Sequence, residues 1–195
     1  PLRGVVHAAG VTRDGLAARK GRADIDAVLA PKVTGADLLD AATRDDPLDF
    51  FVLFSSVVAE TGNPGQVDYA AANAYLHAFA EHRAALVGRG ERSGRTVAVG
   101  WPLWTDGGMT VDDATRRLFA RNWGMVPMDT TAGLSALVRG YAAGEPVFCA
   151  VATAGTTTAA PPSPPAPPAT PLPPAPAPVA TETPEGALRA AAEDR

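Results

Sequence analysis

The sequence has few of the features that mark secreted, membrane-spanning or polyanion-binding proteins. It contains one cysteine, Cys149, among 195 residues, so an internal disulfide is excluded and a reducing compartment, the cytoplasm, is expected. It has no run of about 18 apolar residues, so no membrane-spanning helix is predicted. The formal net charge is only -4, which gives no sign of a nucleic-acid-binding surface.

A glycine-rich dinucleotide-binding turn is also absent. Such a fold needs a strand, a G-x-G-x-x-G turn and a helix that together hold the pyrophosphate, and no such motif precedes Gly10. The one dense glycine stretch, residues 88–94, lacks this spacing and follows a predicted helix instead of a strand. The chain begins with Pro1 and ends at Arg195 inside an apparent helix, so we expect a piece of a longer polypeptide.

What is present fits a globular α/β domain, because hydrophobic residues make up 46% of the chain. Apolar runs predict strands at residues 2–9, 50–54, 96–101 and 146–151. Helical spacing predicts helices at residues 23–29, 34–42, 67–87, 112–123 and 130–142. Pro31 is predicted to separate the first two helices, and Thr130 is a candidate N-cap. The alternation predicts a Rossmann-like, doubly wound parallel sheet with helices on both faces, truncated at its amino-terminal half.

From Ala154 onward the composition changes. Twelve of the 19 prolines fall between Pro161 and Pro184, and such a segment cannot build a core. Residues 154–183 are therefore predicted to be a disordered, extended tether between domains, with a proline-motif ligand for a partner domain as the alternative. Residues 184–195 are predicted to begin a following helical domain, with proline at the first helical position.

Residues 50–79 carry most of the candidate chemistry. The strand at 50–54 runs into Ser55 and Ser56, and a turn rich in glycine and proline follows. Ser56 would lie at the carboxyl end of a parallel strand, where open α/β sheets bind ligands. Tyr69 and Asn73 are four residues apart on a predicted helix and so share one face. This pattern predicts half of an active site.

Five motifs occur in order: HAAGV at 7–11, APK at 30–32, FSS at 54–56, GQVDYAAANAYL at 65–76 and WPLWTDGGM at 101–109. Together they resemble the ketoreductase domain of modular type I polyketide synthases, a branch of the short-chain dehydrogenase/reductase superfamily. The last motif, followed by GMVP at 124–127, resembles the trans-acyltransferase type. The resemblance implies that residues 1–153 are the carboxyl-terminal catalytic part of such a domain.

The resemblance implies a catalytic tetrad of Lys32, Ser56, Tyr69 and Asn73. This branch has asparagine four residues after the tyrosine and takes its lysine from the preceding helix, as here. Tyr69 would be the general acid that protonates the alkoxide left by hydride delivery, and Ser56 would donate to the substrate oxygen. Lys32 would lower the pKa of Tyr69 from about 10 and touch the nicotinamide ribose. Asn73 would order a water in the proton relay.

Taken singly, each tetrad residue has a structural alternative. Tyr69 could be a half-buried packing residue, and Ser56 could be a strand-end cap. Lys32 could be a solvated charge, and Asn73 could satisfy a backbone carbonyl. Their joint spacing favours the catalytic interpretation.

The resemblance implies NADPH as cofactor. The residues expected to form the remaining cofactor wall are Ala8, Ala9, Gly10, Lys32, Trp101 and Pro102. Gly10 is expected to let the backbone approach the ribose. No metal is expected, since His77 and His82 lack acidic or thiol companions, and His7 is predicted to be a buried core histidine.

The candidate substrate and stereocontrol residues are Asp14, Thr61, Trp104 and Met109. Ketoreductases that give the D-configured hydroxyl usually carry Leu-Asp-Asp after HAAGV, and only Asp14 survives of that motif here. The opposite class carries tryptophan where this chain has Thr61. These positions favour the D-configured β-hydroxyl product. Trp104 and Met109 lie in a glycine-containing loop expected to contact the substrate.

Two functions from different classes follow. The first is NADPH-dependent reduction of a β-ketoacyl thioester held through phosphopantetheine on an acyl carrier protein, with neighbouring synthase domains as further partners and no nucleic acid or membrane partner. The second is a non-catalytic, reductase-like structural domain of a synthase module. All four tetrad residues are present, which favours the enzyme. By itself the chain is expected to be inactive, because its first strand would present an unpaired apolar edge.

Overall fold

The computed structural model describes residues 2–107, 109, 111 and 113–153. The predicted tether and the predicted following domain, residues 154–195, lie outside the described residues. Within this part of the chain, four strands form one sheet in the order β1-β2-β3-β4. They are β1 (Gly4–His7), β2 (Phe50–Ser56), β3 (Arg95–Trp101) and β4 (Val147–Cys149). All neighbours pair in parallel, which confirms the predicted α/β parallel sheet.

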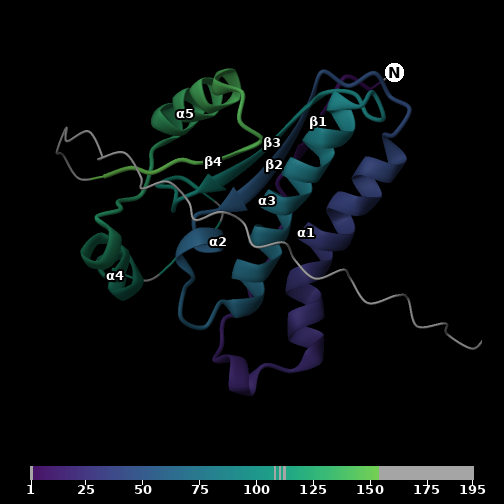
Figure 1. Ribbon diagram of the computed structural model, residues 1–195. Coiled ribbons are helices and arrows are strands. Elements are labelled where there is room, and N and C mark those ends of the chain that lie inside the picture. Colours follow the sequence, from purple (N-terminus) through teal and green to yellow (C-terminus); the bar gives the residue numbers. More distant parts are fainter. Residues whose placement is uncertain (1, 108, 110, 112, 154–195) are drawn as a thin grey trace, which may run out of the picture. The chain divides into compact units, whose positions relative to one another are not determined.

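Helices cover both faces of this sheet. In Figure 1, α1 and α3 lie side by side on one face and α5 lies on the other. The helices are α1 (Arg22–Ala42), α2 (Val58–Thr61), α3 (Val67–Gly88), α4 (Asp113–Trp123) and α5 (Thr130–Ala143), with a short 3₁₀ turn at Ala17–Arg19. Within the described residues, no helix is both long and apolar enough to cross a membrane.

The central strand β2 shows why the sequence predicted a buried sheet. Successive side chains of a strand point to opposite faces. Phe51 and Leu53 pack into the core below α1 and α3, whereas Val52 packs into the second core, which α5 covers. Because both faces are covered, the strand is apolar along its length instead of alternating.

Pro31 does not divide two helices, contrary to the expectation. Helix α1 runs unbroken through it. Pro31 cannot donate a backbone hydrogen bond, but its carbonyl accepts one from His7 Nε2 at 2.8 Å. Val28 and Ala36, on either side, are fully buried. This packing supports the helix, because tertiary contacts and not propensity provide most helix stability in proteins.

Other predictions differ in detail. Asp129 and not Thr130 caps α5, because its carboxylate accepts from the Ala132 backbone N–H at 2.8 Å. The outer strands are shorter than predicted. His7 is buried, as expected.

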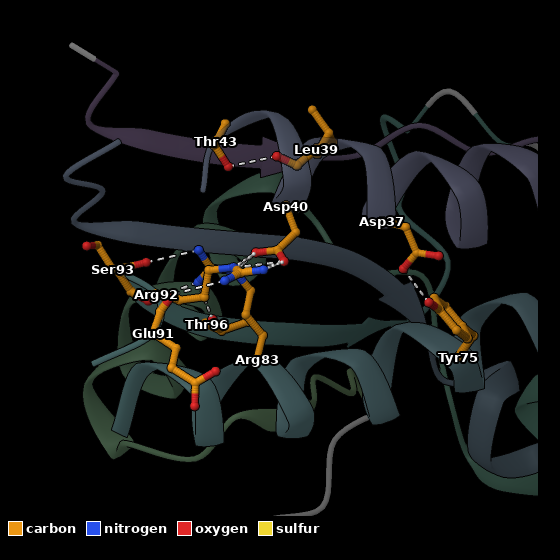
Figure 2. A network of polar contacts seen from close by, with 11 residues as sticks. Asp37, Leu39, Asp40, Thr43, Tyr75, Arg83, Glu91, Arg92, Ser93 and Thr96 are labelled. Atoms are coloured by element: carbon orange, nitrogen blue, oxygen red, sulfur yellow. Dashed lines mark hydrogen bonds and ion pairs between the residues drawn. The ribbon is translucent and has the colours of Figure 1, made fainter. Parts of the chain in front are cut away.

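A polar network closes the amino-terminal end of the sheet, where β3 begins (Figure 2). Asp40 of α1 accepts from Arg83 Nε at 2.7 Å and from Arg92 Nε at 3.0 Å. Arg83 of α3 also donates to Thr96 Oγ1 at 2.7 Å, and its guanidinium lies 4.4 Å from the Phe51 ring centroid. Only 1% of the Arg83 side chain is exposed. The network therefore ties both helices to β3.

Candidate active site

A pocket of about 870 Å³ opens at the carboxyl ends of β1, β2 and β3, where parallel sheets bind ligands. It brings together three of the four predicted tetrad residues, Lys32, Ser56 and Tyr69. Its lining also includes the predicted site residues Ala8, Gly10, Asp14, Trp101, Pro102, Trp104 and Met109. Asn73, Ala9 and Thr61 are not among the lining residues.

Ser56 is the last residue of β2 and is 8% exposed. Its Oγ accepts a hydrogen bond from the backbone N–H of Val58 at 3.2 Å, so the structural alternative, a cap at the strand end, holds for its oxygen. A hydroxyl that accepts one bond still has its proton to donate. Ser56 can therefore cap the turn and donate to a ligand in the pocket at the same time.

Tyr69 is the third residue of α3, and Asn73 lies one turn further on. Asn73 Nδ2 donates to the Tyr69 carbonyl at 2.7 Å, so the structural alternative holds for the amide nitrogen. Asn73 Oδ1 is different: it is buried and has no hydrogen-bond partner among the described residues. Buried polar atoms are rarely left without a hydrogen bond. This oxygen therefore remains available to accept a hydrogen bond beside Tyr69.

The Tyr69 hydroxyl has an unusual environment. Burial raises the pKa of Tyr69, the neighbouring side chains of Ser56 and Asn73 lower it, and the Asp14 carboxylate raises it. The hydroxyl donates to Met109 Sδ at 3.7 Å. A phenol titrates at pH ~10 when unperturbed, so Tyr69 is protonated at neutral pH and has a proton to give, while the raised pKa makes it a weaker acid.

Lys32 does not lower the pKa of Tyr69 in this structure, contrary to the expectation. Its ammonium donates to the Phe54 carbonyl at 2.8 Å and lies 5.9 Å from the centroid of the Tyr69 ring. Lys32 is 4% exposed, and burial lowers its own pKa to about 8. The ammonium is thus fixed by the β2 backbone beside the tyrosine ring.

Gly10 makes room for this lysine. A methyl group added at Gly10 would lie 3.0 Å from Lys32 Cε and 3.4 Å from Nζ. The expected reason for this glycine was close approach of a ribose to the backbone. The structure adds a second reason, which is contact with the Lys32 side chain.

A chain of amides and a carboxylate borders the pocket beside Tyr69. Gln66 Nε2 donates to Asp14 Oδ2 at 2.9 Å, and Asn63 Nδ2 donates to Gln66 Oε1 at 2.9 Å. Sequence reasoning missed Gln66 and Asn63. Their position in the turn directly before Tyr69 was the signal that could have found them.

Trp104 forms part of the pocket wall and is held by packing. Its ring centroid lies 4.9 Å from that of Trp101, and a methyl group added at Gly133 of α5 would overlap the ring. The backbone of Thr105 donates to the Met128 carbonyl at 2.9 Å. The loop at Trp104 is therefore anchored to α5 and its preceding segment.

Two predicted site residues lie elsewhere. Ala9 is exposed. Thr61 ends α2, and its hydroxyl donates to the Val57 carbonyl at 3.2 Å. Across the described part of the chain, no group of three or more His, Cys, Asp or Glu side chains could hold a metal ion. His77 pairs with Glu60 at 3.0 Å, which is a single contact and not a metal site.

Several known proteins are similar to this chain. The family model of the KR domain matches residues 1–106. Polyketide synthase PksL of Bacillus subtilis (strain 168) is 47% identical over 145 residues, which are 74% of this chain and 3% of that protein. Polyketide synthase GfsB of Streptomyces halstedii is 45% identical over 145 residues, 74% of this chain and 2% of that protein.

Solved structures agree. A ketoreductase domain from the bacillaene assembly line has a TM-score of 0.75 at 41% identity, over 77% of this chain and 36% of that one. An A1-type ketoreductase has a TM-score of 0.70 at 35% identity, over 79% of this chain and 31% of that one. The chain thus spans a few per cent of the curated relatives and about a third of these solved chains. With the parallel sheet and the pocket at its carboxyl ends, these matches show that the chain belongs to the ketoreductase (KR) domain family of polyketide synthases.

Proposed function

We propose that residues 1–153 are the carboxyl-terminal catalytic part of a ketoreductase domain that reduces a carrier-bound β-ketoacyl thioester to the β-hydroxyacyl thioester in polyketide biosynthesis. The observation that carries the proposal is the convergence of Lys32, Ser56 and Tyr69 on one pocket. Residues 154–183 are proposed to be the tether, and residues 184–195 to begin a following domain, with a carrier protein as one candidate. Acyl carrier protein and neighbouring synthase domains are the proposed partners.

The residues of the pocket fit a nicotinamide cofactor, for which we propose NADPH. The buried Trp101 Nε1 has no hydrogen-bond partner among the described residues, and Trp101, Gly10 and Pro102 all line the pocket. Lys32 of α1, whose ammonium donates to the Phe54 carbonyl of β2, supplies a positive charge. When bound, the cofactor supplies a hydride.

The chain's own groups then manage the proton. Ser56 donates to the ketone oxygen, which stabilises the negative charge that develops there. Tyr69, which is protonated at neutral pH, gives its proton to that oxygen as the oxygen becomes basic. Asn73 Oδ1 accepts from a water that relays a proton from the solvent to the tyrosinate. The thioester is unchanged, and one ketone becomes one hydroxyl.

We propose the D-configured hydroxyl as product. Asp14 lies in the pocket wall and bonds Gln66. Thr61, where the opposite class carries tryptophan, does not line the pocket. The ratio of the two hydroxyl configurations in the product tests this assignment.

The test of the function uses a complete domain, because β1 is an outer strand of the described sheet and exposes 57% of Val6. Such an edge pairs with other chains, so we propose that this chain alone does not turn over. The test protein is a fusion of the part of the bacillaene ketoreductase domain that this chain does not match, followed by this chain. We call this fusion the joined domain. Consumption of NADPH with a β-ketoacyl thioester supports the proposal. A folded joined domain that binds NADPH without turnover on any such thioester contradicts it and favours a structural role.

Replacing Gly10 with alanine in the joined domain should displace Lys32. Its new methyl group would press on Lys32 Cε, and the bond to the Phe54 carbonyl should lengthen. We expect kcat/KM to fall about tenfold, since small misplacements of catalytic groups cost rate. Gly15→Ala is the matched control, because its added methyl group meets nothing within 4 Å. Equal kinetics for both variants would contradict the contact with Lys32.

Because Lys32 is buried, the stability of the domain should increase as the pH rises into the alkaline range. Burial lowers its pKa from 10.5 to about 8, so between these values the unfolded chain holds a proton that the folded chain does not. The free energy of unfolding therefore rises with pH across this window and is reduced below it. Urea unfolding of the cofactor-free joined domain at several pH values measures the rise. In Lys32→Met the rise should be smaller, and an unchanged rise would refute its assignment to Lys32.

A further inference from the structure

A buried ion pair lies directly beside the tyrosine. Lys20 Nζ is 2.7 Å from Asp68 Oδ2, and the two side chains are 3% and 2% exposed. Lys20 also donates to the carbonyl of Arg13. Asp68 Oδ1 accepts from the backbone N–H of Tyr69 at 2.9 Å. One pair of side chains thus connects the loop at Arg13 to the first turn of α3, which carries Tyr69.

The same loop forms one wall of the pocket through Val11, Thr12, Arg13 and Asp14. Two further bonds tie it to the segment before Tyr69. They are Gly15 N to the Gly65 carbonyl at 2.9 Å and Gln66 Nε2 to Asp14 Oδ2 at 2.9 Å. Of the three links, the ion pair is the one that reaches both the wall and the tyrosine backbone.

Stability alone is a poor explanation for this pair. Taking two charges out of water is costly, and apolar side chains of similar volume are often as stabilising as a buried ion pair. What an ion pair adds is directed bonding at fixed angles and lengths. Here those bonds end on a pocket-wall carbonyl and on the tyrosine N–H.

We propose that Lys20 and Asp68 are positioning residues, which hold the wall of residues 11–14 at a fixed distance from the Tyr69 hydroxyl and so restrict the orientation of the bound ketone. This inference rests on the proposed ketone reduction. A wall that moves admits the ketone in either orientation, so both the rate and the configuration of the product depend on the pair.

The test compares Lys20→Met, Asp68→Asn and the double variant in the joined domain. Each single variant leaves one buried charge without its partner and should lower the melting temperature. The double variant has no unpaired charge and should recover most of the loss in melting temperature. Its kcat/KM should nevertheless remain lower by about 10- to 100-fold, since a misplacement of about 1 Å can cost that much. Its product should contain both hydroxyl configurations where the parent gives one.

Asp40→Asn is the control, because it weakens a buried pair at the opposite end of the sheet (Figure 2). It should lower the melting temperature and leave the product ratio unchanged. A double variant with the parent's kcat/KM and product ratio would overturn the inference. A double variant that fails to fold while Asp40→Asn folds would also overturn the inference, because the pair would then be required for folding and not for positioning. An inactive parent would instead contradict the proposed function.

Discussion

The Tyr69→Phe variant of the joined domain is expected to lose ketone reduction while it keeps its fold and its affinity for NADPH. The change removes only the hydroxyl that faces the pocket beside Met109. Proton transfer by a positioned side chain contributes on the order of 100- to 10,000-fold to a rate, so kcat should fall by that factor. Steady-state NADPH oxidation with a β-ketoacyl thioester measures it, and cofactor titration by fluorescence measures binding.

Tyr75→Phe is the matched control for this experiment. Tyr75 lies on the same helix, but its hydroxyl donates to Asp37 of α1 outside the pocket. Burial and the Asp37 carboxylate raise the pKa of Tyr75 to about 12, and its proton is directed to Asp37 and not to the pocket. Its variant should retain the parent's kcat. Retained activity in Tyr69→Phe, or equal losses in both variants, would show that Tyr69 is not the acid.

The largest effect on stability is expected from Asp40→Ala. The carboxylate lies between Arg83 and Arg92 (Figure 2), and its loss leaves a guanidinium in the core with no counter-charge. Removing one partner of a buried ion pair costs about 3–5 kcal/mol. At roughly 2–4 °C per kcal/mol for a domain of about 150–250 residues, the melting temperature should fall by about 6–20 °C. Urea unfolding of the joined domain gives the free energy directly.

The effect of Asp40→Ala should shrink in acid. Burial alone would raise the pKa of Asp40, but the hydrogen bonds and charges of Arg92 and Arg83 outweigh it and hold the pKa below its usual value. The ionised carboxylate therefore stabilises the fold above the pKa of the unfolded chain, and this stability is lost as the pH falls through the lower, folded pKa.

Asp37→Ala, on the same helix, removes an exposed contact and should cost no more than about 1 kcal/mol. An equally small loss in Asp40→Ala would contradict the role of the network.

Local patterns were sufficient to predict the sheet and the position of the pocket. The apolar run of β2 predicted a strand that is buried on both faces. Ser56 was predicted to lie at the pocket because it ends that strand. The four-residue spacing of Tyr69 and Asn73 survives in α3 because the helix is regular. These features depend on neighbours in sequence, so the sequence displays them.

Features that depend on distant contacts were not predictable. Pro31 suggested a break, and only the packing of α1 against the sheet shows why the helix continues. Lys20 and Asp68 meet across 48 positions and have no local signature. The hydrogen bond from the Lys32 ammonium to the Phe54 carbonyl joins residues 22 positions apart and likewise has no local signature. Each case was decided by a partner far along the chain.

The close contact between Trp104 and Gly133 restricts the order in which the two residues can change during evolution. Any side chain at Gly133 would overlap the indole ring, so the tryptophan must shrink before the glycine can be replaced. A smaller residue at position 104 would first leave a void against α5, since helices seldom collapse fully onto a lost side chain. Remodelling of this pocket wall is therefore expected to pass through an intermediate of reduced stability, and pocket sequences transplanted from relatives should include both positions together.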